Sequence, residues 1–116
     1  MPSSGLDPAV LAWIAERFKV LAEPARLRIL QALREGEKTV TELLAATGLS
    51  QPNLSRHLQR LHAAGFVERR RNGVHVRYRL AGDDVFLLCD IMCARLEAEV
   101  RQREARLRAA GRGRRS

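Results

Sequence analysis

The sequence predicts a mainly α-helical fold with one short β-hairpin, and three observations carry this prediction. Apolar residues recur at three- and four-residue steps from Pro8 to about Gly65, which is the spacing of amphipathic helices. The period then changes to two on either side of an Asn72-Gly73 dipeptide, a pattern typical of a hairpin. From Asp83 to about residue 110 nothing breaks a helix. The expected order of elements is therefore α-α-α-α-β-β-α.

The first two predicted helices are separated by Glu23-Pro24. Proline suits the first position of the second helix, because the N–H that it lacks would have no helical partner there. Gly36 stands where that helix is expected to end. The apolar residues with helical spacing are Val10, Leu11, Ile14, Phe18 and Leu21 in the first helix and Leu27, Leu30 and Leu33 in the second.

A short helix from about Val40 and a second helix opened by Ser50 follow, with a left-handed turn expected at Gly48 between them. Ser50 is the expected N-cap of the second helix, and Pro52 lies in its first turn. This helix has an apolar side, made by Leu54, Leu58 and Leu61. Its other positions are polar, and they are Gln51, Asn53, Ser55, Arg56, His57 and Arg60.

The predicted hairpin is rich in arginine. Arg69, Arg70 and Arg71 precede the turn, and His75, Arg77 and Arg79 follow it. Alternate residues of a two-stranded ribbon share a face, which groups Arg70, His75 and Arg77. The Asn72-Gly73 dipeptide predicts a type I′ turn, with positive φ at both of these residues.

The last predicted helix runs from Asp83 to about Ala110, about 40 Å at 1.5 Å per residue, which is longer than one small domain covers. A long helix with an apolar stripe needs a partner helix, and the simplest partner is its own copy across a two-fold axis. The stripe has mostly heptad spacing, interrupted by Arg103, and consists of Phe86, Cys89, Cys93, Leu96, Val100 and Leu107.

Composition excludes several classes of protein. The chain has 116 residues, 46% hydrophobic and 29% charged, which suits one folded domain and argues against disorder. No run approaches 18 uncharged apolar residues, so we expect no membrane helix, and the first eight residues do not have the pattern of a signal peptide. Two cysteines close together in the sequence cannot staple a secreted fold, which favours a reducing cytoplasm. Gly-rich phosphate loops, nucleophile elbows and clustered carboxylates are absent from the sequence, so we do not expect an enzyme.

The formal net charge of +8 is concentrated in two segments. Residues 50–80 carry seven Lys or Arg and one Asp or Glu, and residues 101–116 carry the same numbers, whereas residues 1–49 carry six of each sign. Nineteen of the 21 basic residues are Arg, which binds phosphates and guanine edges better than Lys does. This distribution is typical of a nucleic-acid binder.

A short helix, a glycine turn, a capped polar helix and an arginine-rich hairpin, in this order, predict a winged helix-turn-helix. In that fold the second helix of the pair enters the major groove, where Gln and Asn can pair with adenine and Arg with guanine. The expected partner is double-stranded DNA with a pseudo-palindromic site. The expected contacts are Ser50, Gln51, Asn53, Ser55, Arg56, His57, Arg60, Arg69, Arg70, Arg71, His75 and Arg77.

The expected division of the chain has three parts. Residues 1–7 form a flexible N-terminus, residues 8–110 form one DNA-binding and dimerisation domain, and residues 111–116 form a basic disordered tail. The arginines of the tail would add salt-sensitive attraction to DNA without reading its sequence.

Residues 18–80 resemble the ArsR family of small bacterial winged helix-turn-helix repressors. The matching stretches are Leu21–Leu30 (LAEPARLRIL), Leu49–Leu58 (LSQPNLSRHL) and Gly73–Leu80 (GVHVRYRL). The resemblance implies a homodimer joined through its first and last helices. It also implies that the protein binds its operator when free of effector and is released when an effector binds.

The sequence departs from the two best-known metal sites of this family. Thr39 and Thr41 stand where arsenic sensors carry thiols, and hydroxyls are poor ligands for soft ions. In the zinc-type site of the last helix, Phe86 replaces a histidine, and no histidine follows His75.

Cys89 and Cys93 remain as candidates for sensing an effector. At i and i+4 they share one helix face, where their sulfurs can bridge a thiophilic metal(loid) ion such as arsenite. Alternatively the cysteines only pack at the dimer seam, and the effector is a redox change, a small molecule or a protein.

Overall fold

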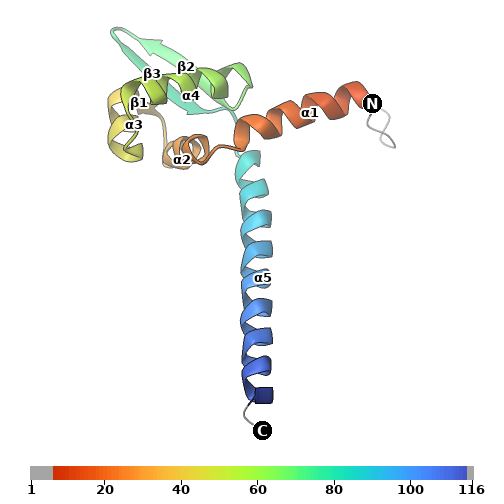
Figure 1. Cartoon of the computed structure of the whole chain (residues 1–116). Coiled ribbons are helices and arrows are strands. Elements are labelled where there is room, and N and C mark those ends of the chain that lie inside the picture. The colour runs from red at the N-terminus through yellow and green to blue at the C-terminus, as the bar shows by residue number, and fades with distance from the viewer. Residues whose placement is uncertain (1–6, 115–116) are drawn as a thin grey trace. The chain divides into compact units, whose positions relative to one another are not determined.

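The computed structural model describes residues 7–114 and forms two compact units, one ending at Gly82 and the other beginning at Asp83 (Figure 1). The single domain expected over residues 8–110 is thus divided after Gly82. The first unit contains α1 (Pro8–Leu21), α2 (Pro24–Leu33), β1 (Lys38–Thr39), α3 (Val40–Thr47), α4 (Gln51–Ala63), β2 (Val67–Asn72) and β3 (His75–Leu80). The second consists of α5 (Asp84–Arg114). The predicted order of helices and hairpin strands is confirmed, with one additional short strand, β1.

The helix starts follow from local side-chain chemistry. Asp7 caps α1, since its carboxylate accepts a hydrogen bond from the Val10 N–H at 3.0 Å. At the start of α3, Thr39 and Glu42 form a capping box, in which each side chain accepts from the other residue's backbone N–H. Hydrogen bonding of the Glu42 carboxylate to Thr39, first of all to its backbone N–H, lowers the pKa of Glu42. Ser50 caps α4 by accepting from the Asn53 N–H at 3.4 Å.

The core of the first unit lies between α2, α3, α4 and the sheet. Its largest fully buried side chains include Ile29, Leu30, Leu43, Leu54, Leu58, Leu61 and Val67, each at most 2% exposed. Leu54, Leu58 and Leu61 are the apolar positions that the sequence predicts for α4. Helix α1 is different, because none of its residues is buried.

The sheet has three antiparallel strands in the order β1-β3-β2. β1 pairs through Lys38 with Tyr78 and through Thr39 with Arg77. Two residues are too few to show an alternating pattern, so sequence periodicity does not reveal this strand.

The turn of the hairpin differs from the predicted type I′. Asn72 pairs with His75, so the two turn residues are Gly73 and Val74. Gly73 has a φ of +65°, whereas no non-glycine residue of the described chain has positive φ. Positive φ at the first turn residue alone is the type II′ pattern, and Gly73 is the residue that permits it.

Helix α5 continues to Arg114, four residues beyond the expected end at Ala110. Residues 111–114, expected in a disordered tail, are therefore helical. Glycine in a helix costs only about 1 kcal/mol, so Gly111 and Gly113 do not end it without a proline or a cap. The remainder of the expected tail (residues 115–116) and most of the expected flexible N-terminus (residues 1–6) lie outside the described residues. Over the described range, no helix is both long enough and apolar enough to cross a membrane.

Candidate nucleic-acid interface

Helix α4 presents a polar side whose residues are exposed. Gln51, Asn53, Ser55, Arg56 and Arg60 are all exposed, as is the cap residue Ser50. The Arg56 guanidinium donates to the Asn53 side-chain oxygen at 3.4 Å, so these two side chains lie together on the first turns of the helix. The structure thus brings most of the predicted reading residues to one accessible helix surface, beside its capped N-terminus.

His57 is the exception, because the structure buries this side chain, whereas the prediction of a DNA contact required it to be exposed. Its side chain is only 6% exposed. Residues 54, 57, 58 and 61 have the i, i+3, i+4, i+7 spacing of one buried helix face, so His57 belongs with Leu54, Leu58 and Leu61. The spacing of His57 relative to these leucines, read from the sequence, was therefore sufficient to predict its burial.

His57 is held in the interior by Arg26 of α2. The Arg26 Nε–H donates to His57 Nδ1 at 3.1 Å, so Nδ1 acts as an acceptor and the ring is neutral. Burial lowers the pKa of His57, and the neighbouring charges of Arg26 and Arg56 lower it further, against the smaller opposing effect of Glu23.

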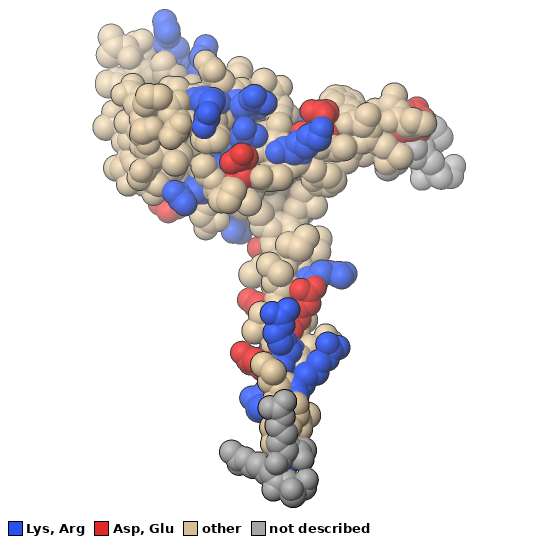
Figure 2. Space-filling model, in the orientation of Figure 1, with Lys and Arg blue, Asp and Glu red and all other residues tan. Residues whose placement is uncertain are grey.

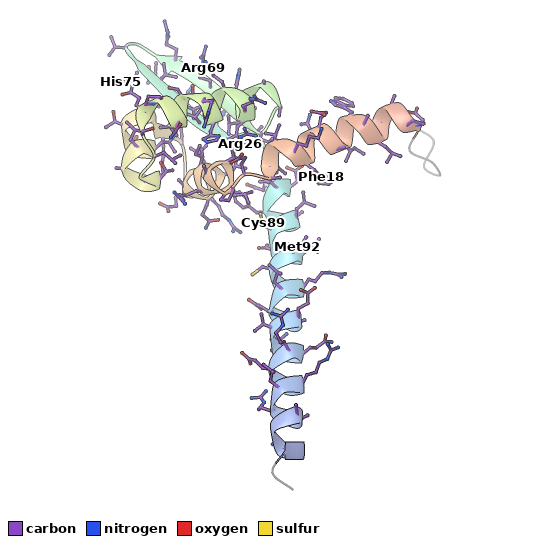
Figure 3. The ribbon with its side chains drawn as sticks, viewed as in Figure 1. Phe18, Arg26, Arg69, His75, Cys89 and Met92 are labelled. Atoms are coloured by element: carbon purple, nitrogen blue, oxygen red, sulfur yellow. The ribbon has the colours of Figure 1, made fainter. Side chains whose placement is uncertain are left out.

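The register of the hairpin assigns its basic residues to two faces. Arg70 lies opposite Arg77, and Asn72 opposite His75, so Arg70, His75 and Arg77 share one face, as predicted. Arg69 and Arg71 lie on the other face, which carries Val67 and Tyr78 of the core nearer the base of the hairpin. Figure 3 shows Arg69 and His75 extending from the hairpin.

Two hairpin arginines are ion-paired within the chain. Arg70 Nη2 lies 2.7 Å from Glu37 Oε2, and Arg79 Nη2 lies 2.7 Å from Glu68 Oε2. Arg69 and Arg71 have no ion pair within residues 7–114, and both are exposed. The arginines of the hairpin are therefore not equivalent, which their sequence alone does not show.

Charged side chains are unevenly distributed over this unit. In Figure 2, Lys and Arg side chains gather over α4 and the hairpin, with few Asp and Glu side chains among them. A positive, protruding surface beside a polar helix can bind a phosphate backbone while the helix contacts base edges.

Cys89 and Cys93 both lie exposed on α5, and Figure 3 shows the position of Cys89 on this helix. The Cys93 thiol donates to Glu97 Oε1 at 3.6 Å, and this bond, with the charge of Glu97, raises the pKa of Cys93. Cys93 also lines a shallow surface hollow beside Leu96, Glu97 and Val100. No group of three or more His, Cys, Asp or Glu side chains within residues 7–114 could hold a metal ion.

A capped polar helix that follows a short helix and a glycine turn, with an antiparallel hairpin after it, defines the winged helix-turn-helix class. A family model described as "Bacterial regulatory protein, arsR family" matches residues 23–69. The chain belongs to the ArsR family, and comparisons over longer stretches of the chain support this assignment.

The chain is 43% identical over 77 residues to the HTH-type transcriptional regulator Rv0324 of Mycobacterium tuberculosis, covering 66% of this chain but only 34% of that protein. It is 41% identical over 81 residues to the biofilm growth-associated repressor of Agrobacterium fabrum, covering 70% of this chain and 69% of that protein.

The fold of this chain is also similar to that of a solved structure. The homodimeric winged helix-turn-helix domain Mb0332 of Mycobacterium bovis, described as a possible ArsR-family regulator, matches with a TM-score of 0.70 and 35% identity. The match covers 84% of this chain and 93% of that one.

Proposed function

We propose that this protein is a sequence-specific DNA-binding homodimer of the cytoplasm that represses transcription until an effector releases it from its operator. The observation that carries the proposal is the division of α4 into two sides. Leu54, Leu58 and Leu61 are at most 1% exposed, while the polar residues of the first turns are exposed beside a basic hairpin. A helix that packs on the core through its apolar side and exposes polar side chains on the opposite side can contact base edges in a major groove.

Two exposed apolar surfaces support the homodimer. On α1, Trp13 is 67% and Phe18 53% exposed, and on α5, Leu96, Val100 and Leu107 are each more than half exposed. Apolar side chains at such spacing along a helix are typically covered by a second helix. Homodimerisation of the related Mb0332 domain agrees with a second copy as the partner.

The experiment compares specific with non-specific binding. Wild-type protein first enriches a duplex from a random DNA pool, and Arg56→Ala is then tested on that duplex and on a shuffled duplex of equal composition. Loss of a guanine contact costs about 1–3 kcal/mol, so we expect a roughly 5- to 150-fold loss on the enriched duplex and a much smaller loss on the shuffled one.

The control variant is Lys19→Ala, which removes one charge from an exposed position of α1. It should weaken binding to both duplexes to the same small extent. Equal losses for Arg56→Ala on the two duplexes would remove Arg56 from the reading surface. Failure of the wild type to enrich any sequence would contradict the proposed function itself.

We propose that the effector is a thiophilic ion such as arsenite, bound by Cys89 and Cys93. Both thiols are exposed and share one helix face, and thiolates are the ligands that soft ions prefer. One chain supplies two thiols, so a third ligand would come from the second copy or from solvent. The raised pKa of Cys93 means that binding must displace its proton, so affinity should increase with pH.

The test of the effector is release from the enriched duplex by arsenite. Cys89→Ser with Cys93→Ser should abolish release if the thiols bind the ion. Persistent release in the double variant would leave the cysteines as packing residues. Release by an oxidant with a matching loss of free thiols would favour the redox alternative.

A further inference from the structure

Helix α1 is attached to the rest of the first unit without any buried residue of its own. A helix is usually oriented by an apolar side that packs into the core, and on α1 the least exposed apolar residues, such as Ile14, Val20 and Leu21, are only half-buried. Its more exposed apolar residues, including Trp13 and Phe18, belong to the surface assigned above to the second copy. The angle between α1 and the reading helix α4 therefore depends on polar contacts as well as on this partial packing.

One such contact is Arg26, whose guanidinium bonds to two other helices. Its Nη1–H donates to the Val20 carbonyl at the end of α1 at 3.1 Å, and its Nε–H donates to His57 Nδ1 on α4 at 3.1 Å. Figure 3 shows Arg26 beside α2, close to α4. Both bonds are partly buried, so they are less exposed to competition from water than a surface bond.

A second contact is Arg17 on α1. Its guanidinium lies 5.3 Å from the centre of the Phe66 ring, which follows α4, and 6.0 Å from that of Trp13. A Cβ built on Gly65 would lie 3.2 Å from Arg17 Nη2, so the guanidinium also lies close to the backbone of this corner. Arg17 therefore connects α1 to the C-terminal end of the reading helix.

We propose that Arg26, assisted by Arg17, is a positioning residue for DNA recognition that fixes the reading helix relative to α1, and hence the spacing of the two reading helices in the dimer. This inference rests on the proposed function, because the spacing matters only for a dimer that joins through α1 and reads two half-sites. Arg26 itself does not contact DNA in this scheme.

The chemistry of Arg26 makes the proposal testable by a conservative change. Lysine keeps the positive charge but, as a single ammonium, cannot reproduce the fork that bonds Val20 and His57 together. Arg28, on the same helix, donates to one carbonyl only within residues 7–114, that of Thr47 at 3.2 Å, and a lysine can replace this bond. Arg28→Lys is therefore the matched control for Arg26→Lys.

The experiment uses the full chain and two probes. The first is the duplex that wild-type protein enriches from a random pool, and the second is that duplex with one half-site scrambled. For Arg26→Lys we expect a loss of about tenfold on the intact duplex, as for one or two lost hydrogen bonds, and less than about threefold on the scrambled one. Arg28→Lys should bind both probes as the wild type does.

The pH dependence of DNA affinity distinguishes a positioning role of Arg26 from a role in stability alone. Only a positioning role makes this dependence differ between the intact and the scrambled duplex. The groups facing His57 are Arg26, Arg56 and Glu23, and protonation of Nδ1 would remove the acceptor of the Arg26 bond. The pKa of His57 in the folded protein is lowered below 6.5, so this proton is taken up only as the pH falls well below 6.5. As the pH is lowered through that range, affinity of the wild type for the intact duplex should fall more than affinity for the scrambled one. His57→Gln, whose amide oxygen can accept from Arg26 without titrating, should keep the affinity and lose this difference.

Two results would overturn the inference. One is an equal loss on the intact and the scrambled duplex for Arg26→Lys, and the other is wild-type binding to both. If Arg26→Lys does not fold, Arg17→Gln provides the same comparison and should lose affinity selectively for the intact duplex. If the wild type enriches no duplex, the proposed function fails rather than this inference.

Discussion

Substitution of Glu37 by Gln should increase the number of hairpin cations available to DNA. In the free protein Glu37 Oε2 lies 2.7 Å from Arg70 Nη2, so Arg70 can contact a phosphate only by exchanging one anion for another. Glu37→Gln leaves the Arg70 charge without this partner. The slope of log K against log[salt] changes by about 0.9 for each phosphate contact, so we expect it to steepen by about 1.8 for a dimer.

The stability of the fold should change little in this variant. The Arg70 side chain is 58% exposed and that of Glu37 is 25% exposed, and pairs of this kind contribute at most about 1 kcal/mol. Among the residues that the structure describes, the other oxygen of Glu37, Oε1, is buried without a hydrogen-bond partner, so loss of the charge also removes a desolvation cost. An effect on DNA binding would therefore not arise from unfolding.

The assay is fluorescence anisotropy on a shuffled duplex at several salt concentrations. Glu16→Gln is the matched control, since it removes the same charge from an exposed pair with Lys19 on α1. It should leave the slope unchanged, and adding Arg70→Gln to Glu37→Gln should restore the wild-type slope. Equal slopes for Glu37→Gln and Glu16→Gln would refute the reasoning that Glu37 masks Arg70.

Three further predictions concern stability, each measured by urea denaturation. Leu61→Ala should lower the free energy of unfolding by about 2–5 kcal/mol, because Leu61 is fully buried. Thr39→Ala should lower it by about 1 kcal/mol by removing the capping box of α3, and an unchanged midpoint would contradict this role. The lowered pKa of His57 stabilises the native state above the unfolded-state pKa of 6.5. This stability is lost as the pH falls from 6.5 through the folded-state pKa, so the wild type should lose more stability than His57→Gln between pH 7 and 5.

Local signals in the sequence predicted most of the elements. Pro24 and Ser50 stand at or next to the first residues of two helices, because each suits the unpaired backbone groups of a helix start. The leucines of α4 are buried as their spacing predicts. The same spacing also places His57 on the buried side, although the polar nature of histidine favoured an exposed interpretation.

Features that depend on tertiary contacts or on register could not be read from the sequence. Arg26 meets His57 across 31 positions, and Arg70 meets Glu37 across 33, so no local pattern marks either pair. The Asn72-Gly73 dipeptide indicated the hairpin, but the strand register decides which residues form its turn. The expected DNA contacts other than His57 remain predictions that binding experiments must test.

The spacing of protected segments on DNA tests the central claim most directly. Hydroxyl-radical footprinting of wild-type protein on its enriched duplex should give two protected segments related by a two-fold axis. Their centres should lie about one helical turn apart, roughly 10–11 bp, since each reading helix enters a successive major groove. A single protected segment, or protection without two-fold symmetry, would contradict the account of a dimer that reads DNA with two copies of α4.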